Sequence, residues 1–213
     1  PLITAKAFAT LDALSAGRVI LGVGAGHVEA EFAALGVDFK RRGALLDEAI
    51  DLIVAAWTDE YPTHDGPTWR VRDLGQRPRP GQQPRPPIWI AGSTPPALRR
   101  GAERGDGWLP QGTPRDELPG QIALLREERK RAQGDAPIAI GANAEPLYVG
   151  APAWDVGPRT LCGSGEFLAE RLLAFAALGV SHVQLRFRAR SLAELLEQMD
   201  AFHAEVAPLL AGS

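Results

Sequence analysis

The segment Pro87–Gln111 constrains the fold more than any other part of the chain. It opens with a short run of β-forming residues, Ile88–Ile90, which gives way to small residues and then to a helical pattern. Ser93 or Thr94 is placed to cap that helix, and Pro95 occupies a first-turn position where no amide hydrogen is needed. We therefore predict a strand, a turn, a helix and a second strand within this segment.

The turn between this strand and helix is a predicted anion site. Free N–H groups and the positive end of the helix dipole favour a negative charge there, above all a phosphate. Gly92, which has no side chain, lets a ligand approach the backbone closely. A well-capped helix without a ligand is the competing interpretation.

The same order of strand and helix recurs along the chain. Strands are predicted to begin near five residues: Arg18, Pro87, Gly107, Pro137 and His182. Helices are predicted at residues 27–35, 43–57, 117–132, 166–178 and 192–210, and a further helix is predicted to begin at Pro95. Residues 61–86 are rich in Pro, Gly and Arg and are predicted to form an insertion loop or hairpin. Repeated β/α units indicate an α/β protein with a parallel sheet covered by helices.

Alternation within the strands favours a barrel over an open sheet. In the first strand Leu21 and Val23 share an apolar face, whereas Gly22, Gly24 and Gly26 share a bare one. An open parallel sheet buries both faces in apolar contacts, but a barrel turns small or polar side chains toward its carboxyl-end mouth. The predicted fold is therefore a (β/α)8 barrel of the TIM type. Tight packing or a bulge is the alternative explanation for the glycines.

Polar residues near two later strand ends follow from the same argument. In a barrel Asn143, Gln184 and Arg186 point toward the cavity, where Asn143 and Arg186 are candidate substrate contacts. A solvated strand end is the competing interpretation for the arginine.

Length, charge and composition restrict the class of function. The 213 residues suit a single domain, residues 1–213, and carry a net charge of −3 with arginines spread along the chain. Nucleic acid and anionic membranes are therefore not expected as partners, and a small molecule is. The single Cys162, the absence of a signal-peptide pattern and the short apolar runs predict a cytoplasmic protein.

Several common functional motifs are incomplete or absent in this sequence. The glycines of GVGAG lack the third glycine of a dinucleotide-binding fingerprint, because His27 stands in its place. The four histidines show no metal-ligand spacing, so no metal site is predicted. His27 is a candidate catalytic proton donor beside a glycine-rich strand end, with a plain loop histidine as the competing interpretation.

Three blocks of the chain resemble the luciferase-like oxidoreductases of bacteria, particularly their F420-dependent branch. The blocks are ITAKAFATLDALSAGRVILGVGAGHVEAEFAALGVDFKRRGALLDEAIDLI, PPIWIAGSTPPALRRGAERGDGWLP and FLAERLLAFAALGVSHVQLRF. The resemblance implies a (β/α)8 barrel, often dimeric, that binds F420 or FMN at its carboxyl-end mouth. The family's phosphate-binding turn falls on Gly92, Ser93 and Thr94, and its glycine-rich strand end beside the ring falls on Gly24 and Gly26.

The chain also departs from that family. Members usually carry three further β/α units before the block that begins at Leu2, so only five of eight strands are visible here. A fragment of a longer product or a degenerate member explains this. We expect residues 1–213 alone not to give a stable, active monomer, because a five-stranded arc exposes two unpaired edges.

The resemblance and the missing β/α units leave three candidate functions. The first is an F420-dependent oxidoreductase that moves a hydride between the deazaflavin and an organic substrate. The second is an FMN-dependent monooxygenase of the same family. The third is a non-catalytic flavin-binding or structural protein.

Overall fold

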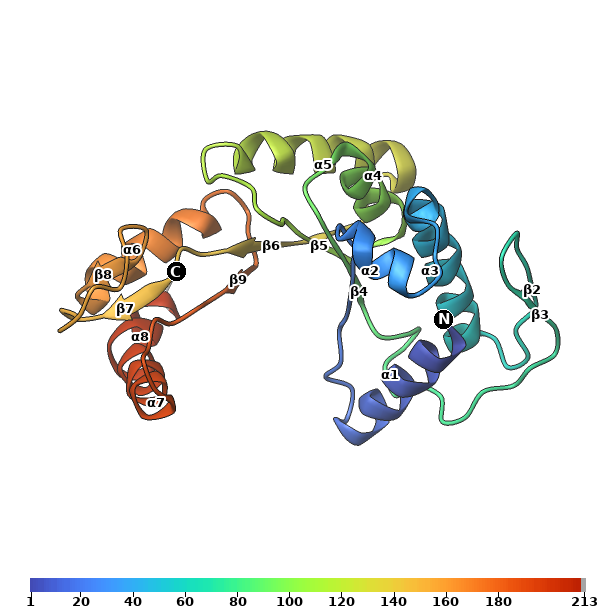
Figure 1. The fold of residues 1–213 in the computed structure, drawn as a ribbon, viewed down its shortest axis with the longest axis horizontal. Helices are drawn as coiled ribbons and strands as arrows, with labels where there is room; N and C mark the ends of the chain where they lie inside the picture. Colours follow the sequence, from blue (N-terminus) through green and yellow to red (C-terminus); the bar gives the residue numbers. More distant parts are fainter. Residues whose placement is uncertain (212–213) are drawn as a thin grey trace. The chain divides into compact units, whose positions relative to one another are not determined.

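The computed structural model describes residues 1–211 and divides into two compact units (Figure 1). Unit 1 comprises residues 1–108 and 123–138, and unit 2 comprises residues 109–122 and the chain from Ala139 onward. The sequence-based prediction of a single domain stays a prediction.

Unit 1 is built from parallel strands and covering helices. Strands β1 and β4 pair in parallel, with Leu21 opposite Ile88 and Val23 opposite Ile90, and β5 follows β4 in the sheet order. Its elements are α1 (Leu2–Leu14), β1 (Leu21–Val23), α2 (Glu29–Ala34), η1 (Phe39–Arg41), α3 (Arg42–Thr58), β2 (His64–Asp65), β3 (Arg70–Val71), β4 (Ile88–Ala91), α4 (Pro95–Arg104), β5 (Gly107–Leu109, whose last residue belongs to unit 2) and the later part of α5 (Leu118–Gln133).

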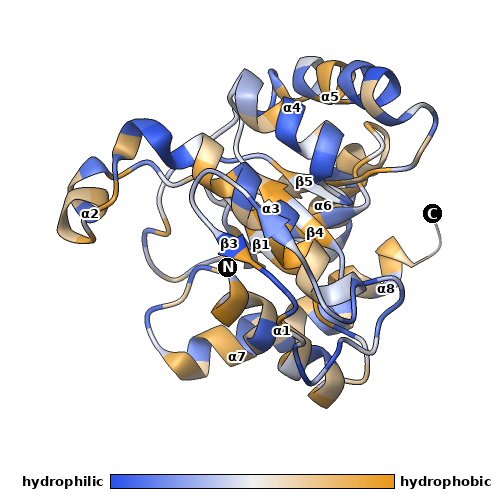
Figure 2. Ribbon diagram, turned by 90° about the vertical axis from the view of Figure 1, so that its right-hand side faces the viewer, coloured by the Kyte–Doolittle hydropathy of each residue, from blue (hydrophilic) through white to orange (hydrophobic). Residues whose placement is uncertain are grey.

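The core of unit 1 lies where α1 and α3 pack on β1 and β4. Ala5 and Ala9, one turn apart on α1, are fully buried, and such small residues let the two helices approach closely. Trp57 of α3 fills the space beside them and donates its indole N–H to the carbonyl oxygen of Ala5 at 2.9 Å. Burying an aromatic side chain of this kind contributes roughly 2–3 kcal/mol to folding. In Figure 2, α2, which has no buried residue, projects away from this core.

A two-stranded hairpin, β2 with β3, lies within residues 61–86, where the sequence predicts an insertion loop or hairpin. Buried Glu48 of α3 accepts the backbone N–H groups of Thr68 and Trp69, at 2.9 and 2.7 Å, in the turn of that hairpin. Burial opposes ionisation, but these amide hydrogen bonds outweigh it and lower the pKa of Glu48 to about 2. A carboxylate thus anchors the insertion to the helix.

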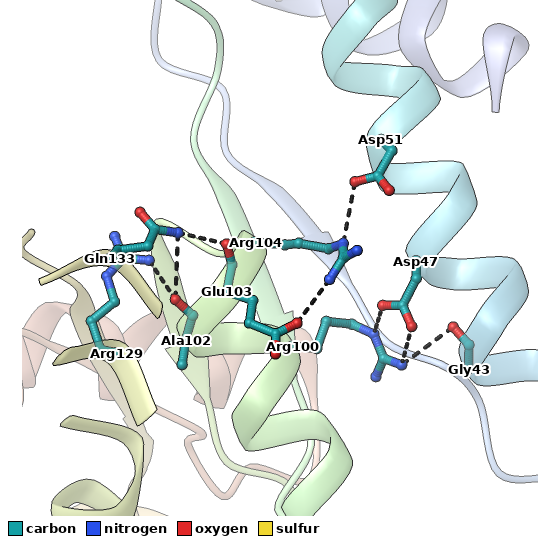
Figure 3. Close-up of polar contacts among 9 residues, drawn as sticks. All are labelled: Gly43, Asp47, Asp51, Arg100, Ala102, Glu103, Arg104, Arg129 and Gln133. Atoms are coloured by element: carbon teal, nitrogen blue, oxygen red, sulfur yellow. Dashed lines mark hydrogen bonds and ion pairs between the residues drawn. The ribbon is translucent and has the colours of Figure 1, made fainter. Parts of the chain in front are cut away.

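Arginines tie the helices of unit 1 together (Figure 3). Arg100 of α4 binds both carboxylate oxygens of Asp47 on α3, at 2.5 and 3.1 Å, and the carbonyl oxygen of Gly43 at 3.2 Å. Arg104 reaches Asp51 one turn further along α3 at 3.2 Å. Arg129 of α5 is buried.

The guanidinium group of Arg129 donates to four carbonyl oxygens, which belong to Ala102, Gly105, Ala136 and Pro137, at 2.8–3.2 Å. Its burial is therefore compatible with its charge.

Unit 2 contains two parallel strand pairs. Its elements are the first part of α5, β6 (Ala139–Asn143), β7 (Leu147–Val149), β8 (Leu161–Gly163), α6 (Gly165–Ala176), β9 (His182–Gln184), α7 (Leu192–Ala201), η2 (Phe202–Val206) and α8 (Ala207–Leu210). Strand β6 pairs with β9 and β7 pairs with β8. The pair β7–β8 is missing from the sequence-based prediction, because Leu161–Gly163 is too short to show a strand pattern.

Two predicted elements of unit 2 need correction. The strand region predicted to begin at Pro137 and to run to Val149 is two strands, β6 and β7, because the chain turns at residues 144–146 and Pro146 has no amide hydrogen for a ladder. The closing helix Leu192–Leu210 contains a π-helical stretch, η2, between α7 and α8. The predicted alternation along β9 and the two residues after it is confirmed, since Gln184 and Arg186 are exposed while Val183 and Leu185 are half-buried.

Glu194 of α7 organises one end of unit 2. It accepts the indole N–H of Trp154 at 2.8 Å, the backbone N–H of Arg190 at 2.7 Å and the hydroxyl of Tyr148 at 3.3 Å. The Arg190 side chain and amide lower the pKa of Glu194 to about 2, although burial acts against this.

These strands and helices confirm the α/β class with parallel strands. The described residues 1–211 hold no closed eight-stranded barrel, although all five predicted strands are present as β1, β4, β5, β6 and β9. None of the helices in this part of the chain is long and apolar enough to cross a membrane.

Candidate functional site

The carboxyl ends of β1 and β4 form one candidate site in unit 1. Residues 19–25 alternate as predicted, with Leu21 buried and Gly22 and Gly24 exposed. A Cβ added at Gly22 would meet no atom within 4 Å, and one added at Gly24 would lie 3.5 Å from the Cβ of Ala91 at the end of β4. The glycine face is therefore open, and it adjoins the turn that follows β4.

That turn, Gly92–Thr94, needs glycine at its first position. Gly92 has φ +124°, a conformation that side chains disfavour, and an added Cβ would stand 3.0 Å from the Cβ of Ala97. The structure thus brings Gly24 together with the predicted phosphate turn at adjacent parallel strand ends. Their role as cofactor contacts stays a prediction.

The hydrogen-bond donors that this turn offers to an anion differ from the predicted ones. Pro95 and Pro96 open α4 without amide hydrogens, and the N–H groups of Ala97 and Leu98 both bond to the carbonyl oxygen of Thr94. The helix itself therefore offers few free amides. The remaining attraction for an anion comes from the helix dipole and from Thr94, whose exposed side chain makes no capping hydrogen bond.

Trp108 is a further residue of this site that the sequence analysis missed. Its side chain is fully buried on β5, and its indole N–H donates to the carbonyl oxygen of Gly92 at 2.7 Å. This bond holds the Gly92 carbonyl toward β5, so the next peptide N–H, that of Ser93, points the opposite way. The sequence did offer a signal for this contact. Trp108 is an aromatic residue with a polar nitrogen, and it lies on the strand that follows the glycine turn.

Gly26 and His27 lie in the exposed connection between β1 and α2. Gly26 has φ +78°, and a Cβ there would come within 2.9 Å of the Phe32 ring, so its conformation and packing both require glycine. His27 makes no hydrogen bond within residues 1–211. Conformation and packing therefore explain a glycine at position 26, while the cofactor contact of Gly26 and the proton-donor role of His27 stay predictions.

A cavity of about 730 Å³ in unit 2 brings together both predicted substrate contacts. It is lined by Asn143 at the carboxyl end of β6, by Arg186, and by Gln184 from β9. The amide nitrogen of Asn143 donates to the carbonyl oxygen of Pro110 at 2.7 Å, which holds the side chain in place and leaves its oxygen as an acceptor.

Arg115 shapes one wall of this cavity. It binds both oxygens of Glu145 at 3.2 and 3.3 Å, donates to the carbonyl oxygen of Arg171 at 2.8 Å, and lies 4.3 Å from the centre of the Phe175 ring. Its donors and its charge are thus engaged within unit 2.

Residues 1–211 show neither a cluster of metal-ligand side chains nor an activated thiol. Within residues 1–211 no group of three or more His, Cys, Asp or Glu side chains could hold a metal ion. Burial raises the pKa of the half-buried Cys162 thiol, which disfavours its reactive thiolate form.

Comparison with known proteins identifies the family. The model of the luciferase-like monooxygenase family matches residues 1–155. A protein named F420-dependent glucose-6-phosphate dehydrogenase, from Intrasporangium calvum, is 35% identical over 152 residues, which cover 66% of this chain and 45% of that protein. The chain spans about half the length of this and the other foremost curated relatives.

Solved structures show the same fold. The monooxygenase RslO1 from Streptomyces bottropensis matches with a TM-score of 0.83 at 20% identity, over 98% of this chain and 74% of that one. An F420-dependent secondary alcohol dehydrogenase, solved in complex with an F420-acetone adduct, matches with a TM-score of 0.81 at 18% identity over the same shares. With the family match over most of its length, the chain belongs to the luciferase-like monooxygenase family.

Proposed function

We propose that this chain carries the cofactor-binding strand ends of an F420-dependent oxidoreductase, which transfers a hydride between the deazaflavin and an organic substrate. The curated relatives named for F420-dependent glucose-6-phosphate dehydrogenase support F420 as the cofactor. A complete (β/α)8 barrel with three further units is part of this proposal, as are a cytoplasmic location and a homodimer.

The observation that carries the proposal is the meeting of an open glycine face with a glycine turn. Gly22 and Gly24 leave space at the end of β1, and Gly92–Thr94 turns away from the end of the adjacent β4. Any side chain at Gly24 would reduce that space, while the fold itself would accept a Cβ there. A flat ring with an attached phosphate suits this arrangement, because one part of the site is flat and the other favours an anion.

The residues of the candidate sites then have the following roles. Thr94 offers a hydroxyl to the phosphate, Trp108 fixes the turn through the Gly92 carbonyl, and Gly24 leaves room beside the ring. Asn143 orients the substrate through its free oxygen, and His27 is the proposed proton donor. Hydride transfer is the chemistry that F420 supplies when it is bound.

An FMN-dependent monooxygenase is the second proposal. The description of the matching family and the RslO1 monooxygenase structure favour it. Separate fluorescence titrations with F420 and with FMN distinguish the two, and binding of neither would support a non-catalytic role instead.

Ser93→Asp tests the phosphate turn. We expect the affinity for the cofactor to fall by about tenfold or more, because a carboxylate would face the phosphate in a partly dry site. Ser93→Asn is the matched control, since it has nearly the same size without the charge. Equal affinities for the Asp and Asn variants would contradict the assignment.

A further inference from the structure

Three arginines in the cavity of unit 2 have no partner among the described residues. Arg159, Arg186 and Arg188 all line the cavity, and none of their guanidinium groups makes a hydrogen bond or an ion pair with any residue from 1 to 211. Arg115 and Glu145, the other two charged residues of the lining, neutralise each other. The cavity therefore holds three positive charges without a counter-charge in its lining, although the whole chain has a net charge of −3.

The backbone fixes where two of these side chains begin. The N–H of Leu147 donates to the carbonyl oxygen of Arg186, and the N–H of Arg188 donates to that of Leu147, both at 2.9 Å. Residues two apart on an extended chain share a face, so Arg186 and Arg188 start roughly 7 Å apart on the same side as Gln184. On the opposite side Phe187 packs edge-to-face against Phe202, with ring centres 5.5 Å apart.

Arg159 reaches the same cavity from another segment, the connection between β7 and β8. The carbonyl of Gly157 accepts the N–H of Thr160 at 3.1 Å, and Asp155 accepts the N–H of Gly157 at 2.9 Å, so the backbone around Arg159 is held in a turn. Guanidinium groups thus converge from two directions. A planar fork of N–H donors matches the oxygens of a phosphate or a carboxylate, and it binds such a group through more than one hydrogen bond.

We propose that this cavity binds an oxyanion group of the substrate, a phosphate ester or a carboxylate, through Arg159, Arg186 and Arg188. That the bound anion belongs to a substrate rests on the proposed function. The existence of an anion site rests on unit 2 alone. The oxygen of Asn143 is then available to accept a hydroxyl of the same molecule. The substrate class is accordingly an acidic, hydroxylated organic molecule.

Calorimetric titration of the protein with inorganic phosphate, and separately with citrate, tests the anion site without any cofactor. We expect Arg186→Gln to weaken binding of the preferred anion by about tenfold and the triple Gln variant to abolish it, since each lost charge-assisted hydrogen bond is costly. Arg171→Gln is the matched control, because Arg171 is exposed in the same unit but does not line the cavity. Tighter binding of phosphate indicates a phosphate ester, and tighter binding of citrate indicates a carboxylate.

Two results would overturn the proposal. One is unchanged anion binding in the triple variant, with a thermal melt showing that it is folded. The other is loss of phosphate binding when the protein is saturated with F420 or FMN, combined with weaker cofactor binding in the triple variant, because the arginines would then serve the cofactor. Failure of cofactor binding alone, with the anion site intact, would count against the proposed function and not against this site.

Discussion

The arginines of the two units differ in how their guanidinium donors are used. In unit 1 these donors bind groups of the same unit, as in Arg100, Arg104 and Arg129. In unit 2 the cavity arginines have no partner among residues 1–211, and these are Arg159, Arg186 and Arg188. The first set joins three helices (Figure 3). The second set surrounds a cavity. The residue type is the same in both regions, so its role follows from whether its donors are already satisfied.

The glycines show the same contrast. Gly105 ends α4 in a crowded place, where an added Cβ would lie 2.8 Å from the carbonyl oxygen of Gly101 and 3.0 Å from Ile90. Gly22 and Gly24 face open space at the end of β1. Positions whose space or hydrogen-bonding capacity is used within the fold are expected to control stability, and open positions are expected to control binding.

Arg129→Met gives the largest expected change in stability. The substitution removes the donor of four carbonyl oxygens, and the bonds to those of Ala102 and Gly105 are buried, so the free energy of unfolding should fall by about 2–4 kcal/mol. Urea denaturation measures it. Arg131→Gln, on the exposed side of the same helix, is the control and should change stability by about 0.5 kcal/mol or less, because its only side-chain partners among residues 1–211 are the neighbouring Glu127 and Glu128. Equal losses in both variants would break the contrast between satisfied and exposed arginines.

Gly24→Val is expected to act on binding instead. The side chain would occupy the open face beside the end of β4, so cofactor affinity should fall by about tenfold or more, with little change in the melting temperature. Gly105→Ala is the counterpart: it should lower the melting temperature and leave the affinity of the folded protein unchanged. If Gly24→Val instead lowered stability strongly while the folded fraction bound cofactor normally, Gly24 would be a packing residue.

The sequence predicted most of the element order, because strand–turn–helix punctuation is local. All five predicted strands are found, and the alternation around Leu21 and Gly22 survives in the burial pattern. The pair β7–β8 was missed, because its pairing is set by packing in unit 2 and not by a recognisable strand pattern. The correction at Pro146 is different, since the proline itself was a visible break.

The candidate sites were predictable only in part. Asn143 and Arg186 were placed in one cavity by alternation and strand order, and they do share one. The bond from Trp108 to Gly92 could not be read from spacing, since it joins neighbouring strands through the tip of a side chain. That Arg159 and Arg188 have no partner in the described part of the chain was equally hidden, because pairing depends on which carboxylates lie nearby in three dimensions.

The stability of unit 2 at low pH should report on Glu194. Its pKa is lowered from 4.5 to about 2 in the folded protein, so its stabilising effect is fully present above about pH 4.5 and is lost as the pH falls toward 2. We expect the urea midpoint of the wild type to fall over this range more steeply than that of Glu194→Gln, which cannot titrate. Parallel pH profiles for the two proteins would show that the hydrogen bonds to Glu194 carry no net stabilisation.

Arg104→Gln should have the smallest effect of the set. Arg104 is about one-third exposed and its partners Asp51 and Glu103 are half exposed, so water screens the pairs. We expect the free energy of unfolding to fall by about 0.2–1 kcal/mol, and the difference to disappear at high salt. Arg99→Gln, an exposed neighbour on α4 without a partner among residues 1–211, should change nothing measurable. A loss as large as that of Arg129→Met, and insensitive to salt, would mean that even the exposed edge of the arginine network is an integral part of unit 1.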